Sequence, residues 1–200
     1  MPQRRIITRA EWGARPAKKT PRPITTPTPV YGHHSAGALD AGGNGVWWDD
    51  VRGIQAFHQD GRGWDDVAYN FVIGGGQIFE GRGWGVAGAH TAGQNSVSQA
   101  WCLIGNYEFM EPTDDDLDAI VWLMADGVRH GHWTLDLSPH RDAPGASTSC
   151  CGRNLIARLP ETVRAIANFS VGVDHVDLAS AKSRGVIVTN TPDVLSDATA

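Results

Sequence analysis

Two histidines and a cysteine have the types and positions that favour metal chemistry. His33 lies beside His34 at the end of an apolar segment, His140 lies in a polar loop, and Cys150 follows ten residues later. Two imidazoles and one thiolate are ligands that zinc favours, and three protein ligands leave a fourth position open for water. An open position is typical of a catalytic zinc site. Spacing alone indicates this weakly, because a lone histidine at a strand end is more often a surface or hydrogen-bonded residue.

The cysteines are arranged neither for disulfide bonds nor for a structural zinc site. There are three cysteines, two of them adjacent, so the sequence has no disulfide framework. The paired CxxC and HxxxH spacings of a structural zinc site are missing. Cys102 lies in an apolar segment and is interpreted as a core thiol. We therefore expect synthesis in a reducing cytosol.

Composition limits the classes of function. Two hundred residues, 41% of them hydrophobic, fit one globular domain with some chain to spare. The formal net charge of −5 argues against a nucleic-acid-binding protein. Residues 1–7 are basic but lack the apolar region of a signal peptide, and no run is long enough for a transmembrane helix.

Basic residues gather near the N-terminus, where Glu11 is the one acidic residue among the first 22. Such a cluster is either a solvated surface segment or a contact with an anionic surface, and the sequence leaves both open. The cluster consists of Arg4, Arg5, Arg9, Arg15, Lys18, Lys19 and Arg22.

The strands expected to position the candidate ligands alternate with turns. Residues 20–29 contain four prolines, so they form an extended loop rather than a helix or a central strand. Glycines 74–76 are expected to turn one strand into its hairpin partner. The expected strands are 30–34, 69–73, 77–80 and 99–104, the last one buried because its apolar run is unbroken.

Three helices are expected around these strands. Asp49 or Asp50 is expected to cap a helix over 51–59, and Thr113 caps a helix that ends near Arg129. A last helix is expected over 153–166. Strands joined by hairpins and covered by amphipathic helices indicate an α/β fold of the α+β-like kind, a central mixed β-sheet flanked by helices.

Six segments, in order, resemble motifs of the peptidoglycan-recognition-protein and type-2 N-acetylmuramoyl-L-alanine amidase family. Together they extend over about residues 5–165, which makes the resemblance specific. They are Ile7–Ala14, Tyr31–Gly37, Tyr69–Gly74 with Ile78–Trp84, Gly88–Thr91, Ile104–Tyr107, and His140–Asp142 with Thr148–Gly152.

The resemblance implies roles for individual residues. It places the zinc ligands on His33, His140 and Cys150. It places Tyr69 beside the reacting water, although a packed core tyrosine is the alternative, and it suggests that Thr148 helps to hold the carbonyl oxygen. The resemblance further suggests substrate contacts at His90, Trp84 and His34. For His90 the alternative is a turn histidine without a special role. His34 is also expected to support the ligand His33.

Two departures from the family pattern concern the ligand loop. The family usually follows its ligand cysteine with proline, and here Cys151 takes that place, where a second thiol is able to compete for the metal. We assign the ligand to Cys150 because residues 148–150 keep the register up to Gly152. The loop 143–147 is also slightly longer than in many relatives, a change that loops tolerate.

From about residue 164 the sequence resembles a different family, the D-2-hydroxyacid dehydrogenases of the glyoxylate reductase kind. Residues 164–175 and 177–195 carry this resemblance and predict a βαβ-like appended fragment. About 37 residues are too few for an independent core, and the glycines of 81–86 do not form a GxGxxG motif. We therefore expect an amidase domain over 1–163 and a fragment over 164–200 that is not an independent domain. We expect no dehydrogenase activity.

The expected function is zinc-dependent hydrolysis of the amide bond between N-acetylmuramic acid and L-alanine in peptidoglycan. The alternative is a recognition module that binds peptidoglycan without cutting it. The absence of a signal peptide fits a phage endolysin released by a holin-type pore, and equally a cytosolic wall-recycling amidase. Peptidoglycan is the expected partner of a monomer, with no nucleic acid and no membrane involved.

Overall fold

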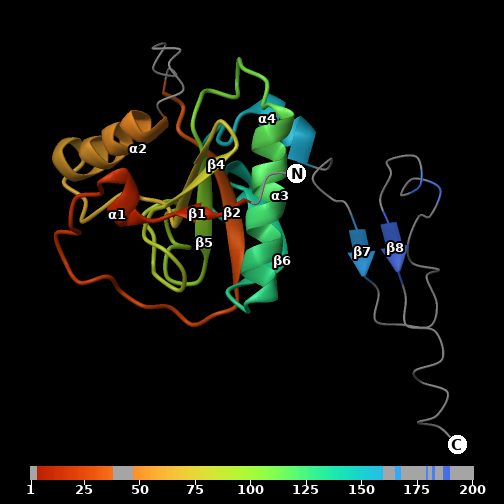
Figure 1. The fold of residues 1–200 in the computed structure, drawn as a ribbon, viewed down its shortest axis with the longest axis horizontal. Helices are drawn as coiled ribbons and strands as arrows, with labels where there is room; N and C mark the ends of the chain where they lie inside the picture. Colours follow the sequence, from red (N-terminus) through yellow and green to blue (C-terminus); the bar gives the residue numbers. More distant parts are fainter. Residues whose placement is uncertain are drawn as a thin grey trace, which may run out of the picture. The chain divides into compact units, whose positions relative to one another are not determined.

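The elements of the fold surround one sheet, shown in the computed structural model of Figure 1. The structure describes residues 4–37, 47–159, 165–167, 179, 182 and 187–189. Residues 1–158 and 159–200 form two units, which are described separately.

The first unit contains a six-stranded mixed sheet in the order β1-β4-β3-β5-β2-β6. The hairpin of β3 and β4 is antiparallel, and every other neighbouring pair is parallel. The strands are β1 (Ile6–Ile7), β2 (Thr28–His34), β3 (Phe71–Gly74), β4 (Gln77–Glu80), β5 (Gln99–Leu103) and β6 (Trp133–Pro139).

Helices cover both faces of this sheet, which confirms the expected fold class (Figure 1). On one face, Trp12 and Val51 bury their side chains against Val72 and Phe79. On the other face, a long helix packs on β3, β4 and β6. The helices are α1 (Arg9–Trp12), α2 (Trp47–Ala56), which continues as a π-helix over Phe57–Gly61, α3 (Asp114–Arg129), a 3-10 turn over His140–Asp142, and α4 (Arg153–Arg158).

Local sequence explains the best-defined elements. The Thr113 side chain accepts a hydrogen bond from the backbone N–H of Asp116, whose carboxylate accepts one from the backbone N–H of Thr113, so α3 begins with a capping box. All of β5 is buried, because it lies between two parallel neighbours under helices on both faces. Gly75 and Gly76 have φ values of 56° and 71°, which a glycine adopts at little cost in the turn between β3 and β4.

Several expected boundaries were wrong. α2 begins at Trp47, so Asp49 and Asp50 lie in its first turn and do not cap it. β3 begins at Phe71, because the Asn70 side chain takes over the bonding there: its oxygen accepts from the backbone N–H of Ala100, and its amide donates to two carbonyls in the loop 83–86.

The end of the first unit also differs from expectation. α4 ends at Arg158, and residues 160–164 of the expected helix lie outside the described residues. The short elements β1 and α1 were not expected, and neither was β6, which lies at the sheet edge with Leu135 and Asp136 exposed.

In the second unit, β7 (Ala165–Ala167) and β8 (Ile187–Thr189) form a parallel two-stranded sheet. This agrees with the two strands of the expected βαβ-like step. Most of the intervening segment and the chain end lie outside the described residues.

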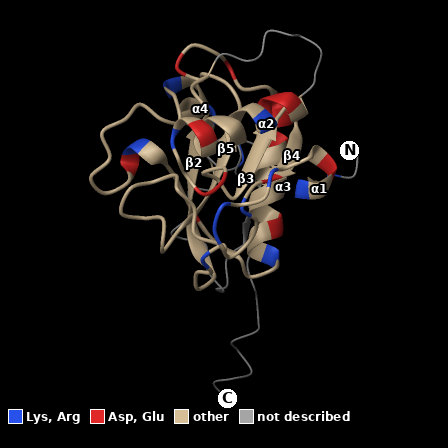
Figure 2. Cartoon of the chain, turned by 90° about the vertical axis from the view of Figure 1, so that its left-hand side faces the viewer, with Lys and Arg blue, Asp and Glu red and all other residues tan. Residues whose placement is uncertain are grey.

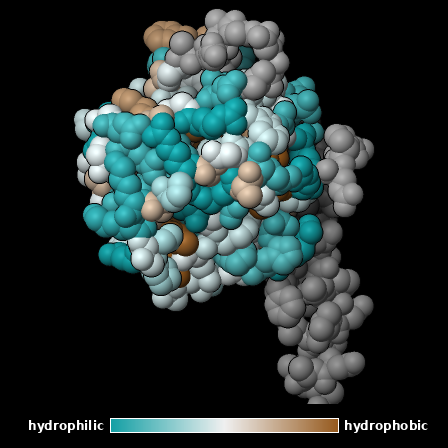
Figure 3. Space-filling view, turned by 60° about the vertical axis from the view of Figure 1, so that its left-hand side comes forward, coloured by the Kyte–Doolittle hydropathy of each residue, from teal (hydrophilic) through white to brown (hydrophobic). Residues whose placement is uncertain are grey.

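The face in Figure 3 is largely hydrophilic, with hydrophobic residues scattered singly. Across the described chain the large exposed hydrophobic side chains are Phe57, Val97, Phe109 and Leu135. No helix in the described ranges is both long and apolar enough to span a membrane.

Candidate metal centre

The sheet brings two of the expected ligands together at one edge. In a parallel pair the carboxyl ends of both strands lie at the same edge. β2 and β6 are such a pair, with Gly32 opposite Pro139, so the residues that follow, His33 and His140, are neighbours. Their ring centroids are 4.5 Å apart.

Cys150 completes the cluster from the following loop. The backbone N–H of Arg141 donates to the Cys150 carbonyl over 2.8 Å, which fixes this loop beside the 3-10 turn. The Cys150 Sγ lies 3.6 Å from Nδ1 of His33 and accepts a hydrogen bond from the backbone N–H of His34. One ligand atom each from His33, His140 and Cys150 lies within 4.8 Å of the others.

The donor set fits zinc. With Zn–N and Zn–S bonds of about 2.05 and 2.3 Å, tetrahedral coordination separates nitrogen and sulfur by about 3.6 Å, as found between His33 and Cys150. Burial, together with the other histidines nearby, holds the pKa of His33 well below its ordinary value, so its imidazole is neutral, as a ligand must be. This group is therefore able to bind a metal ion.

The neighbouring cysteines lie outside this group. Cys151 and Cys102 are both fully buried, which agrees with the interpretation of Cys102 as a core thiol. Burial raises the pKa of Cys150 to about 11, an effect that the His34 N–H opposes, and burial raises that of Cys151 to about 12.

A chain of hydrogen bonds supports His33 from the side opposite Cys150. The Thr91 Oγ1 lies 3.2 Å from Nε2 of His33 and 3.0 Å from Nδ1 of His90. With Nδ1 of His33 serving as a ligand, Nε2 carries the proton and donates to Thr91, whose own hydroxyl donates to His90. Thr91 was not singled out in the sequence; its position directly after His90 was the one available signal.

His90 itself is buried, and burial lowers its pKa to about 3. Its ring centroid lies 5.4 Å from that of His33, and its backbone N–H donates to the Asn95 side chain. These contacts connect His90 with the ligand His33. The expected contact of His90 with substrate stays a prediction.

Tyr69 lies against the cluster, and its expected place beside the reacting water stays a prediction. Its ring centroid is 5.2 Å from that of His33. Burial, and then the Cys102 and Cys150 thiols, raise the pKa of Tyr69 well above its ordinary value. The phenol therefore keeps its proton at neutral pH and is a hydrogen-bond donor. The buried His58, another residue that the sequence did not single out, packs against the Tyr69 ring at 5.8 Å and stacks on Trp64.

Three other candidates lie in different surroundings. The exposed Thr148 accepts a hydrogen bond from the Cys150 N–H through Oγ1, so it shapes the ligand loop. The His34 ring accepts from the backbone N–H of Tyr107 through Nδ1, which holds the end of β2 against the neighbouring loop.

Trp84 packs against Phe71 and Trp133 and stacks on His132, none of which belongs to the metal-binding group. The functional roles of Thr148, His34 and Trp84 stay predictions.

Comparison with known proteins agrees with this geometry. The family model described as N-acetylmuramoyl-L-alanine amidase matches residues 23–153. The model of the D-isomer specific 2-hydroxyacid dehydrogenase catalytic domain matches the shorter segment 145–200. The chain is 34% identical to peptidoglycan-recognition protein SC2 of Drosophila simulans over 151 residues, which cover 75% of this chain and 82% of that protein.

Two further similar proteins are one named as an amidase and one solved in complex with a ligand. The N-acetylmuramoyl-L-alanine amidase of Sus scrofa is 39% identical over 118 residues, 58% of this chain but 20% of that protein. Among solved structures, a Tyr-to-Phe mutant of Drosophila PGRP-LB in complex with tracheal cytotoxin has a TM-score of 0.69 and 35% identity, covering 77% of this chain and 92% of that one.

Proposed function

The chain belongs to the family of N-acetylmuramoyl-L-alanine amidases and peptidoglycan-recognition proteins, and on that premise we propose that it hydrolyses peptidoglycan with zinc as cofactor. The bond cleaved joins the lactyl carbonyl of N-acetylmuramic acid to the nitrogen of L-alanine. Water adds to the carbonyl carbon and the carbon–nitrogen bond breaks, leaving a lactyl carboxylate and an alanine amine.

The observation that carries this proposal is the grouping of His33, His140 and Cys150 with Tyr69 beside them. A recognition module does not need a metal-binding group, whereas a hydrolase uses one. When bound at these residues, zinc supplies a Lewis acid that makes water nucleophilic near neutral pH.

The chain's own residues have separate parts in this proposal. Tyr69 donates a hydrogen bond from its protonated phenol to the oxygen that becomes negatively charged as water adds. Thr91 and His90 hold the His33 ring in one orientation through the hydrogen bonds described above. The Thr148 hydroxyl, at the exposed side of the ligand loop, is proposed as a further contact to the carbonyl oxygen.

Binding without cleavage is the second candidate function. It is favoured by relatives named as recognition proteins, and by structures of such proteins with tracheal cytotoxin, a monomeric diaminopimelic acid-type peptidoglycan. We propose peptidoglycan as the partner under both candidates.

Release of new L-alanine amino termini from purified peptidoglycan tests the proposal. We expect release that stops with a chelator and returns when zinc is added. A folded, zinc-loaded protein that binds peptidoglycan and releases no amine would contradict the amidase and favour the recognition module.

A further inference from the structure

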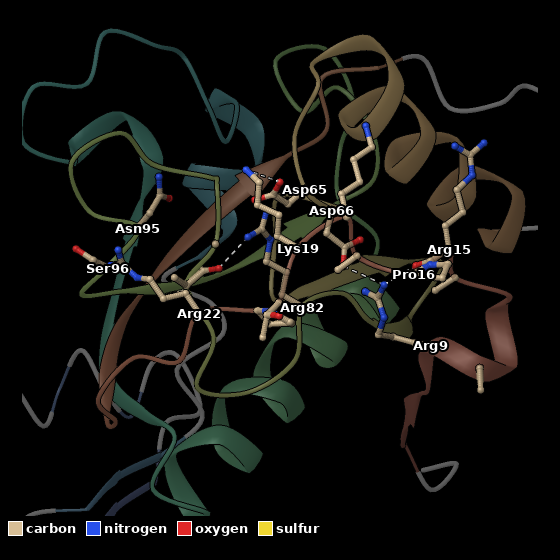
Figure 4. Close-up of a pocket in the computed structure, with 18 of the residues that line it drawn as sticks. Arg9, Arg15, Pro16, Lys19, Arg22, Asp65, Asp66, Arg82, Asn95 and Ser96 are labelled. Carbon is tan, nitrogen blue, oxygen red and sulfur yellow. Dashed lines mark hydrogen bonds and ion pairs between the residues drawn. The ribbon is translucent and has the colours of Figure 1, made fainter.

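A basic cavity lies beside the metal centre, on the other side of the loop 87–96. Its volume is about 1100 Å³, and Gly88, Asn95 and Ser96 of that loop form part of its lining. Figure 4 shows Arg22 at the Asn95–Ser96 end and Arg15 at the other end. Six cationic side chains line it: Arg9, Arg15, Lys18, Lys19, Arg22 and Arg82.

This concentration of charge is unusual for an acidic chain. The cavity contains six of the 17 Lys and Arg residues but only two of the 22 Asp and Glu residues, Asp65 and Asp66. The rest of the chain therefore carries 11 basic and 20 acidic residues. In Figure 2 many of the acidic residues lie on helices, whereas several basic ones lie on loops. Five of the cations come from the N-terminal basic cluster, and the fold adds Arg82.

Three of the cations are partly neutralised. Arg9 pairs with Asp66 at 3.0 Å, Lys19 pairs with Asp65 at 3.2 Å, and Arg15 pairs with Asp60. Within the described part of the chain, Lys18, Arg22 and Arg82 make no ion pair. The Arg82 guanidinium donates to the carbonyls of Val67 and Ala87, which fix its orientation without cancelling its charge. Positive charge thus remains along the cavity for a ligand.

From this cavity we propose a binding site for a phosphodiester polymer of the cell wall, of the poly(glycerol phosphate) type. Guanidinium groups match phosphate oxygens with two parallel hydrogen bonds. Cations spread along a cavity of this size suit repeating phosphates better than a single anion. The choice of a wall polymer rests on the proposed function.

The lining disfavours nucleic acid, the other common phosphodiester. Proteins that hold single-stranded nucleic acid usually stack bases on aromatic side chains, and none of the described residues lining this cavity is aromatic.

The site is connected with the metal centre through Asn95. The Asn95 side-chain oxygen accepts from the backbone N–H groups of His90 and Thr91, and Thr91 contacts the ligand His33. A polymer in the cavity would therefore lie against the loop that supports the metal ligand.

Calorimetric titration of the full chain with poly(glycerol phosphate), in the presence of a chelator, tests this proposal independently of the metal and of cleavage. We expect binding that weakens roughly 10- to 20-fold between 50 and 200 mM salt, as about three phosphate contacts require. Inorganic phosphate should displace the polymer better than chloride at equal ionic strength.

The decisive variant combines Arg22→Gln with Lys19→Gln, because both side chains are exposed and their substitution should leave the fold intact. It should bind roughly tenfold more weakly, and the slope of log affinity against log salt should be less steep by about 1.4, because each lost phosphate contact contributes about 0.7. The matched control combines Arg129→Gln with Arg153→Gln. These residues are also exposed, Arg153 is ion-paired as Lys19 is, and both lie outside the cavity. The control should bind as the parent does.

Three results would overturn the proposal: no binding at low salt, an equal loss in both double variants, or single-stranded DNA of equal charge binding as tightly as the polymer. The last result would assign the cavity to nucleic acid. Amide release from peptidoglycan stripped of phosphodiester polymer tests the amidase separately, so failure of one proposal is distinguishable from failure of the other.

Discussion

Replacing Thr91 with valine is expected to weaken zinc binding while the three ligands stay in place. The Thr91 side chain is 1% exposed, and its hydroxyl lies between Nε2 of His33 and Nδ1 of His90. Valine has nearly the same shape and no hydroxyl. The substitution therefore removes the polar bridge with little change in packing.

The magnitude follows from those two hydrogen bonds. Each imidazole nitrogen left buried without a partner costs about 1–3 kcal/mol, so the free energy of unfolding of the metal-free protein should fall by about 2–6 kcal/mol for the two nitrogens together. Loss of a partner that orients a ligand histidine typically reduces metal affinity by about 10- to 100-fold. We expect the zinc affinity of Thr91→Val to fall within that range.

Competition with a chromophoric chelator measures the zinc affinity, and urea unfolding of the metal-free protein measures the stability. Thr28→Val is the matched control. Thr28 is 2% exposed, lies on β2 like His33, and accepts a hydrogen bond from Gln99, but it has no contact with the metal-binding group. It should lose stability and keep its zinc affinity within about twofold.

Two outcomes would refute this reasoning. Parent-like zinc affinity in Thr91→Val would mean that the hydroxyl does not orient His33. An equal loss of affinity in both variants would mean that general destabilisation, and not the bridge, controls metal binding.

Three further predictions concern Tyr69, the two adjacent cysteines and His58. Tyr69→Phe should lose about 10²- to 10³-fold in kcat for amide release and keep its zinc. The control is Tyr107→Phe, which removes a hydroxyl that donates to the Ile104 carbonyl and should keep both turnover and zinc. Equal turnover of Tyr69→Phe and the parent would exclude the phenol from the reaction. Cys150→Ser should lose zinc and activity while Cys151→Ser keeps both, and the reverse result in metal analysis would move the ligand to Cys151. Burial lowers the pKa of His58 from 6.5 to about 4, so the unfolded chain binds a proton that the folded protein does not, and stability should fall by at most about 3 kcal/mol between pH 6.5 and pH 4. Urea unfolding of metal-free His58→Gln should show a smaller fall than the parent or the exposed-site control His130→Gln, and an equal fall in all three would exclude His58 as a cause.

Local sequence was sufficient for the elements that carry their own signals. The capping box at Thr113, the glycine turn after β3 and the unbroken apolar run of β5 each fix a structure over a few residues. The types of the candidate ligands were also evident, because imidazole and thiolate are intrinsically zinc ligands. Such features depend on neighbours along the chain, and so they are readable from it.

Only the tertiary structure decided how those residues meet. β6 is an edge strand in which only Trp133 is buried, so its sequence gives little local signal. Its parallel pairing with β2 nevertheless sets His140 beside His33. Thr91 reaches His33 across 58 residues of sequence, and Arg82 joins the N-terminal cations in one cavity. These contacts form through sheet register and packing between distant segments, which no local pattern encodes. The sequence thus determined the chemistry available to this protein, and the register of a parallel sheet determined which side chains share it.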